Sequence, residues 1–291
     1  MNKLNHVWLS LIFLTIIGII FISIFTQTEK FVKSEEMTDF SYTRLPNEDG
    51  VIILCYHRVL EDNMIVDSVS KVSQNSQLHQ FNVFLSEFQQ QMKDLKKRGV
   101  SILTMEQFIE KRVKKELTGR SVVLTFDDID VTLANNAFPI LEKENIPFTA
   151  FLITGETGNN LSGSQMACWD QIKTLAQSHL ATFGLHTNDL HYQKNGKPIL
   201  STNLSKKTMV RDYKESQKKF EEQLGYQASY FAYPYGAKNK YLTKYMSEDR
   251  IKGIFSLETG VVTNETPLTD MPRLIVTNQN WQTLLQWLDV K

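Results

Sequence analysis

Short apolar runs alternate with longer amphipathic segments along most of the chain. An apolar run of roughly four to eight residues indicates a buried strand, whereas apolar residues spaced three or four apart indicate a helix with one buried face. The runs predict strands at Val51–Tyr56, Val122–Phe126, Phe148–Ile153 and Ala181–His186, and later in YFAYP, GIFSL and RLIVT. The helical spacings predict a stripe through Phe84, Phe88, Met92 and Leu95, a helix opened by a capping box of Thr104 and Gln107, and helices at Thr132–Glu144, Trp169–Gln177, Ser205–Leu224 and Trp281–Leu288.

This alternation of strands and helices predicts an α/β domain that begins near Val51 and continues to residue 291. Parallel strands joined by right-handed helical crossovers, with about seven repeats in some 240 residues, favour a distorted TIM-like (β/α)7 barrel over an open sheet. In such barrels, functional side chains gather at the carboxyl ends of the strands.

The N-terminal segment has a different pattern. Val7–Phe25 is nineteen residues long and has no charged residue, which as a helix would span about 28 Å. We therefore expect residues 1–26 to form a membrane anchor, with a cleaved signal peptide as the alternative, and residues 27–50 to form a polar linker. Either reading predicts an extracytoplasmic protein, attached to the membrane or secreted to the cell surface.

Composition narrows the possible functions. The 291 residues carry no formal net charge, and they lack the basic stripe and the glycine-rich phosphate loop of nucleic-acid and nucleotide binders. We expect no nucleic-acid partner. Cys55 and Cys168 have no metal-finger or redox spacing, and we expect free thiols rather than a disulfide.

Acidic and histidine residues follow two of the predicted strands. Asp127 and Asp128 come directly after Val122–Phe126, and His186 and His191 flank the end of Ala181–His186. The two imidazoles, five residues apart, converge only if the chain bends between them, and the Asn-Asp pair there favours a bend. Two imidazoles and a carboxylate at one end of a barrel form a ligand set for a divalent ion.

The ordered motifs resemble those of polysaccharide deacetylases with a NodB-homology domain, carbohydrate esterase family 4, from Val51 to the C-terminus. Within that family they are more similar to the biofilm poly-β-1,6-N-acetyl-D-glucosamine N-deacetylases. The motifs are CYHRV, TFDD continuing as FDDID, FLITG, HTNDLH, AYPYG, FSLE and MPRLIV. The resemblance implies that Asp127 is the general base, that Asp128, His186 and His191 bind the metal, and that the backbone of Tyr235 completes an oxyanion hole.

Two positions depart from the broader family. Ala232 stands where that family has an arginine before Pro-Tyr-Gly, and no histidine follows His191. Arg273 is the candidate substitute for orienting Asp127, with a rim ion pair as the alternative. His57 is the candidate general acid, with a packing role as the alternative.

The resemblance implies metal-dependent hydrolysis of N-acetyl groups on poly-β-1,6-N-acetylglucosamine by a monomer, leaving a partly cationic polymer at the cell surface. Zn²⁺ is the expected ion, and Co²⁺, Ni²⁺ and Fe²⁺ suit the same ligands. The alternatives are a deacetylase of peptidoglycan or chitin oligosaccharides and an inactive polysaccharide-binding protein.

Overall fold

The computed structural model describes residues 42, 44–62, 81–161 and 163–289. Their elements, in chain order, are β1 (Gly50–Tyr56), β2 (Arg58–Leu60), β3 (Asn82–Phe84), α4 (Leu85–Lys97), β4 (Ser101–Ile102), α5 (Met105–Val113), β5 (Arg120–Phe126), η1 (Leu133–Ala137), α6 (Phe138–Glu144), β6 (Phe148–Leu152), β7 (Asn160–Leu161), β8 (Ser164–Gln165), α7 (Trp169–Ala176), β9 (Ala181–Leu185), β10 (Gln193–Lys194), β11 (Lys197–Pro198), η2 (Ile199–Ser201), α8 (Lys206–Leu224), β12 (Tyr230–Ala232), η3 (Pro234–Gly236), α9 (Lys240–Asp249), β13 (Gly253–Phe255), β14 (Leu274–Ile275) and α10 (Asn278–Asp289).

The main sheet is parallel throughout, in the order β13-β12-β9-β6-β5-β1-β14, with β4 added beside β5. This order follows the chain except that β1 and β14, the first and last strands, are neighbours. The described strands form an open path rather than the closed barrel that the sequence predicts. An isolated parallel bridge, Phe255 to Met271, and a hydrogen bond from the Ile254 amide to the Leu268 carbonyl at 2.8 Å join β13 to the segment before β14. The strands on both sides of this open seam, β13 and β14, are only three and two residues long.

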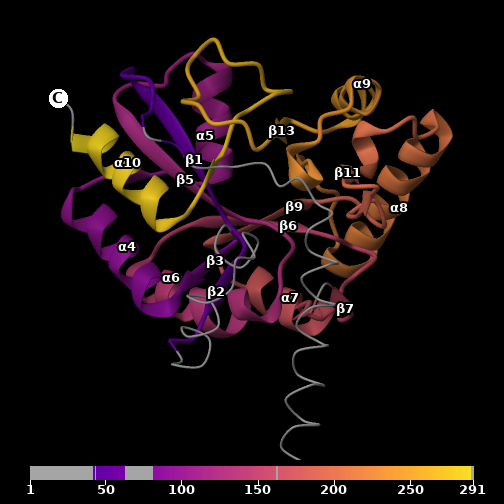
Figure 1. The fold of residues 1–291 in the computed structure, drawn as a ribbon, viewed down its shortest axis with the longest axis horizontal. Helices are drawn as coiled ribbons and strands as arrows, with labels where there is room; N and C mark the ends of the chain where they lie inside the picture. Colours follow the sequence, from indigo (N-terminus) through magenta and orange to yellow (C-terminus); the bar gives the residue numbers. More distant parts are fainter. Residues whose placement is uncertain (1–41, 43, 63–80, 162, 290–291) are drawn as a thin grey trace, which may run out of the picture. The chain divides into compact units, whose positions relative to one another are not determined.

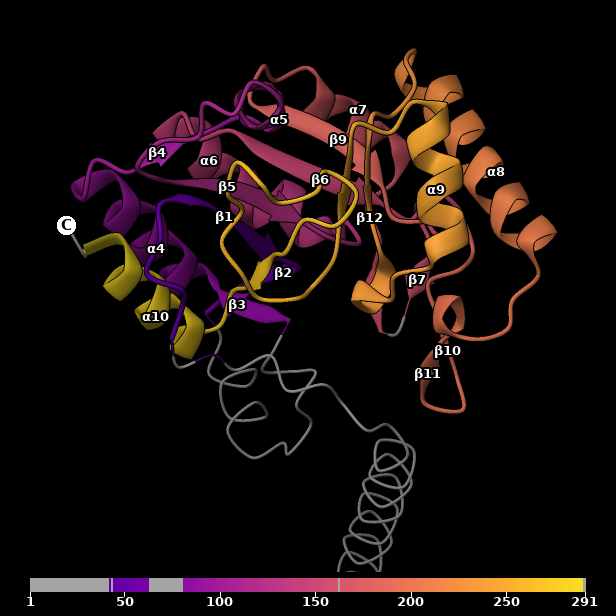
Figure 2. The same cartoon turned by 90° about the horizontal axis from the view of Figure 1, so that it is seen from above.

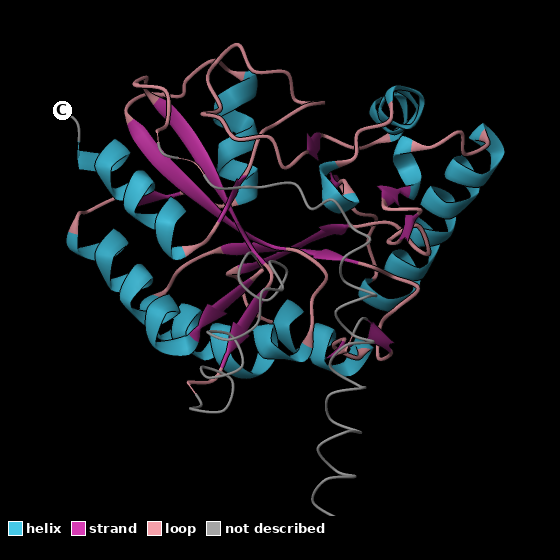
Figure 3. Cartoon of the chain, viewed as in Figure 1, coloured by secondary structure: helices cyan, strands magenta, loops and turns pink. Residues whose placement is uncertain are grey.

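The strands are apolar on both faces because both faces are covered. Side chains of β1 alternate between two cores: Ile52 and Leu54 pack in the larger core with Phe88 of α4, whereas Val51 and Ile53 pack inside the sheet's concave face with Phe108 of α5. Figures 1 and 3 show strands at the centre and helices around them. The concave face leads directly to the site described below.

Local signals set several helix boundaries as expected. Thr104 and Gln107 form the predicted capping box of α5. Ser205 caps α8, and Gly225 ends it at a φ of 81°, in the left-handed region that glycine adopts readily. The predicted helix Thr132–Glu144 is instead a π-helical turn, η1, followed by α6.

Helix α10 lies beside α4 in both views of the ribbon (Figures 1 and 2), and the Trp281 indole donates to the Asp94 carboxylate at 3.3 Å. Leu45 is buried and the carbonyl of Glu48 accepts from Trp287, so residues just before Val51 pack on this helix. The expected anchor Val7–Phe25 lies outside the described residues. Within the described part of the chain, no helix has the length and apolar character needed to cross a bilayer.

Gly184 of β9 is closely packed on the concave face. A Cβ placed there would lie 2.7 Å from the ring of Phe151 and 2.8 Å from the carbonyl oxygen of Tyr230. We expect Gly184→Ala to lower the free energy of unfolding by about 1–3 kcal/mol, because inserting a methyl group forces the neighbours apart. Urea denaturation measures this, with Val113→Ala, at an exposed site, as the control; an unchanged midpoint for Gly184→Ala would contradict the packing.

Candidate active site

Strand alternation brings side chains of β1 and β5 to one place on the concave face. Successive residues of a strand point to opposite faces, so residues two apart share a face. Thr125 and Asp127 therefore continue one face of β5, and Cys55 and His57 continue the matching face of β1, which pairs with β5 in register from Gly50 to Tyr56. The catalytic candidates Asp127 and His57 thus meet at adjacent strand ends.

Arg273 holds Asp127 through two parallel hydrogen bonds. Its two terminal nitrogens donate to Oδ1 and Oδ2 of Asp127, each at 2.6 Å, and both side chains are at most 1% exposed. The guanidinium also donates to the Ser256 carbonyl at 3.0 Å and to the Thr125 hydroxyl at 3.2 Å. Arg273 is therefore the buried partner of Asp127 rather than a rim residue, and the planar fork fixes the carboxylate's orientation.

This pairing keeps Asp127 ionised. Burial raises the pKa of the carboxyl, but the opposing charge and hydrogen bonds of Arg273, with His186 nearby, outweigh it and lower the pKa to about 2. Burial also lowers the pKa of Arg273, and the Asp127 carboxylate more than reverses that effect. The base candidate is a carboxylate at every physiological pH.

A tight turn directly after Asp127 directs the side chain of Asp128 away from Arg273 and toward other partners. Asp128 and Ile129 have φ values of 68° and 59°, in the left-handed region that is costly for a β-branched residue. The Ile129 amide donates to the Asp127 carbonyl at 2.8 Å, and the Ile129 carbonyl accepts from Ala167 at 2.9 Å. The turn therefore lets two adjacent carboxylates serve different partners.

Asp128 lies against the two histidines. Its Oδ1 is 3.0 Å from Nε2 of His191 and 3.5 Å from Nε2 of His186, and the imidazole centroids are 5.0 Å apart. One ligand atom from each residue lies within 4.8 Å of the others. The expected bend is present, since Thr187 has a φ of 72°.

The protonation of His186 suits it to bind a cation. Its Nδ1 lies 2.8 Å from the Ala232 carbonyl, which only accepts, so Nδ1 carries the hydrogen and Nε2 presents a lone pair toward Asp128. Burial lowers the pKa of His186 to about 4, which keeps the ring neutral. For His191, burial lowers the pKa but the Asp128 carboxylate raises it, and the net shift is upward.

The donor chemistry of this triad fits a divalent metal. Two imidazoles and one carboxylate are the ligand types of metal hydrolase centres, and Oδ1 of Asp128 is buried yet accepts no hydrogen bond. The Asp128 and His191 side chains remain 15% and 13% exposed, so the triad is open on one side. An orphaned anionic oxygen beside two imidazole nitrogens is the environment that a cation satisfies.

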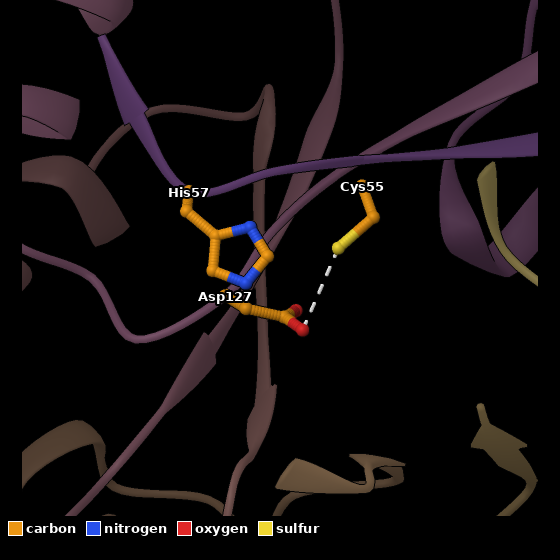
Figure 4. A group of neighbouring side chains, drawn as sticks. All are labelled: Cys55, His57 and Asp127. Carbon is orange, nitrogen blue, oxygen red and sulfur yellow. Dashed lines mark hydrogen bonds between the residues drawn. The ribbon is translucent and has the colours of Figure 1, made fainter. Parts of the chain in front are cut away.

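A second cluster consists of Cys55, His57 and Asp127 (Figure 4), with ligand atoms within 4.8 Å of one another. The Cys55 thiol donates to Oδ2 of Asp127 at 3.5 Å, and burial raises the pKa of that thiol well above its usual value. Because Arg273 already occupies both oxygens of Asp127, a second cation would meet its positive charge. This cluster is suited to holding protons rather than a metal.

His57 contributes a free ring nitrogen to this cluster. Its Nδ1 is buried without a hydrogen-bond partner, and the ring packs 4.6 Å from Phe81. Burial lowers the pKa of His57, although Asp128 and Asp127 oppose the shift. A proton carried on this ring is therefore readily given up.

Tyr235 borders the metal-ligand candidates. It lies in η3 with a φ of 56°, and its ring is 4.8 Å from that of His191. The preceding strand end supplies the Ala232 carbonyl that orients His186. Ala232 stands where the broader family has an arginine, and here its backbone carbonyl contacts His186.

Sequence reasoning missed two residues of this region. Cys55 was expected to be a buried free thiol, and both cysteines are free, but its contact with Asp127 was not foreseen; its place two residues before His57 on one strand was the available signal. Asp212 was missed as well. Asp212 lies between Met209 and Tyr213 on the apolar face of α8. A charged residue on such a face indicates a structural partner.

Comparison with known proteins identifies the family. Residues 114–254 match the family described as polysaccharide deacetylase. The poly-beta-1,6-N-acetyl-D-glucosamine N-deacetylase of Staphylococcus epidermidis is 31% identical over 243 residues, covering 83% of this chain and 84% of that protein. A Staphylococcus aureus protein of the same name is 32% identical over 244 residues, again covering 83% and 84%.

Solved structures show the same fold. The structure of IcaB from Ammonifex degensii has a TM-score of 0.75 and 30% identity, covering 85% of this chain and 100% of that one. The family match includes Asp127, Asp128, His186 and His191, and it begins after His57 and ends before Arg273. By sequence and by structure, this chain belongs to the family of polysaccharide N-deacetylases.

Proposed function

We propose that this protein hydrolyses N-acetyl groups of poly-β-1,6-N-acetyl-D-glucosamine, releasing acetate and leaving free amines on the polymer. The observation that carries the proposal is the pairing of a buried, ionised Asp127 with the open Asp128–His186–His191 triad, 3.8 Å away at the His186 Nε2. The substrate is inferred from the relatives named above, which match along more than four fifths of both chains.

We propose that Asp128, His186 and His191 bind the metal, with Zn²⁺ the expected ion and Co²⁺, Ni²⁺ or Fe²⁺ able to replace it. A divalent ion at this position would polarise the acetyl carbonyl and make a water molecule more acidic. Asp127 does not need to bind the ion, because Arg273 already satisfies both of its oxygens.

The protein's own groups then divide the proton transfers. Asp127 accepts the proton of the attacking water, and Arg273 keeps that carboxylate ionised and correctly oriented. His57, whose ring lies beside Asp127, delivers a proton to the departing glucosamine nitrogen. The backbone of Tyr235, beside His191, is proposed to donate to the oxygen that becomes negatively charged.

We further propose that the enzyme acts outside the cytoplasmic membrane, held there by Val7–Phe25, as a monomer. Each amide hydrolysed leaves an amine that is cationic near neutral pH. Such amines attract anionic groups of the cell envelope, so partial deacetylation would retain the polymer at the surface. Deletion of the gene with unchanged polymer retention would exclude this consequence.

Metal removal tests both the activity and its specificity. We expect acetate and free amine from β-1,6-linked N-acetylglucosamine oligomers. Chelation should remove at least nine tenths of this activity, and Zn²⁺ or Co²⁺ should restore it, because the three ligand side chains cannot polarise the acetyl carbonyl without the ion. β-1,4-Linked chitin oligomers and peptidoglycan fragments serve as parallel substrates. Product from these alone would favour the alternative substrate, and binding without any product would favour an inactive polysaccharide-binding protein.

A further inference from the structure

The chain between His186 and His191 is held by one carboxylate from a different element. Asp212 lies on α8 and is 8% exposed. Its Oδ2 accepts from the backbone amide of Asn188 at 3.0 Å, and its Oδ1 accepts from that of Asp189 at 2.7 Å. Both oxygens of one side chain thus hold two successive amides at the centre of the bend.

The same segment is fixed from its other side by the loop that follows β6. The amides of Thr154 and Gly155 donate to the carbonyls of Thr187 and Asn188, both at 3.1 Å. A Cβ on Gly155 would come within 2.1 Å of Oδ1 of Asp189. The bend is therefore pressed closely against this loop, and Asp212 holds it from the helix side.

The burial of Asp212 is not explained by a close cation, because Lys219 acts on its carboxylate only from beyond ion-pair distance. Among the described residues, no ion pair includes it. A buried carboxylate without a counter-charge is costly unless hydrogen bonds satisfy it, and here two backbone amides do so. Adjacent amides that converge on an anion form a rigid local unit, so this contact orders the bend.

We propose that Asp212 is a positioning residue that sets the separation of His186 and His191 and thereby the metal affinity of the triad. The inference rests on the proposed metal site. Residues that orient metal ligands without touching the metal typically change affinity by about 10- to 100-fold when replaced. In most such sites the orienting group contacts the imidazole itself, whereas Asp212 acts on the backbone between the two imidazoles.

The test is Co²⁺ titration of the metal-free full-length protein, followed by visible absorption, for the wild type, Asp212→Asn and Glu215→Gln. Asparagine keeps the shape of the side chain, but its NH2 group cannot accept a hydrogen bond. One of the two backbone amides therefore loses its acceptor. We expect the Co²⁺ dissociation constant of Asp212→Asn to rise about 10- to 100-fold and its absorption intensity to change, because the ligand geometry relaxes. Glu215→Gln removes a carboxylate of the same helix that forms no ion pair or side-chain hydrogen bond among the described residues, and it should bind Co²⁺ like the wild type.

Thermal unfolding of the metal-free variants separates positioning from general stability. A lower unfolding temperature with an unchanged Co²⁺ dissociation constant would overturn the inference and leave the metal site intact. If wild-type protein and His191→Ala bind Co²⁺ equally, the metal site itself is wrong, and the inference falls with it. Asp212→Glu, which keeps both acceptors, should retain more affinity than Asp212→Asn.

Discussion

Asp127→Asn should reduce kcat/KM for deacetylation by about 10²- to 10⁴-fold, the usual contribution of a general base. The amide has the shape of the carboxylate but cannot take a proton from water, and its oxygen still accepts one of the two bonds from Arg273. Initial rates of acetate release from a β-1,6-linked oligomer, measured with saturating metal, give the effect directly.

Two comparisons identify the cause of that loss. Because the proposed ligands are Asp128, His186 and His191, the Co²⁺ affinity of Asp127→Asn should stay within about threefold of wild type, far less than a lost ligand would cause. Asp170→Asn, at an exposed aspartate of α7, should retain full activity. Turnover of Asp127→Asn at the wild-type rate would remove Asp127 from the mechanism.

Arg273→Met should lower the free energy of unfolding by about 3–5 kcal/mol, the cost of leaving one partner of a buried ion pair without its counter-charge. Asp127 is 1% exposed, so bulk water would solvate its carboxylate poorly without the guanidinium, and the upward effect of burial on the carboxyl's pKa would lose its largest opposing influence. Chemical denaturation of the metal-free protein measures the loss.

The double variant Asp127→Asn/Arg273→Met is the matched control. With both charges removed, no ion is left buried, so the double variant should be more stable than Arg273→Met alone. Arg273→Lys keeps a positive charge but not the two parallel bonds, and should fall between wild type and Arg273→Met. If Arg273→Met costs less than about 1 kcal/mol, comparable with an exposed pair, the pair does not stabilise the domain.

The sequence predicts the parallel strands and the grouping of Asp128 with both histidines well, because apolar runs and strand-end positions are local signals. The contact between Arg273 and Asp127 was also predicted, but only from resemblance, since no periodicity links residues so distant in the chain. The open seam beside β14 was not predicted, and the run RLIVT does not reveal how short β14 is.

Asp212 shows a different limit. Asp212 contacts backbone amides, which every residue type except proline has. The sequence of the bend therefore does not indicate that Asp212 binds there. The π-helical turn η1 was missed for a related reason, because the apolar spacing of Thr132–Glu144 suits an ordinary helix and only tertiary packing selects the wider turn. Both features were found only once the elements were placed in space.

The separation of Asp127 and Arg273 along the chain, 146 residues, has a consequence for biosynthesis. When β5 leaves the ribosome, the arginine that neutralises its carboxylate has not yet been translated, and the first strand still lacks the final strand that completes its edge. Contacts between such distant residues form late and slowly. A chain that still lacks this segment would have no arginine to keep Asp127 ionised, and we expect hydrolysis only after the carboxyl-terminal segment has docked.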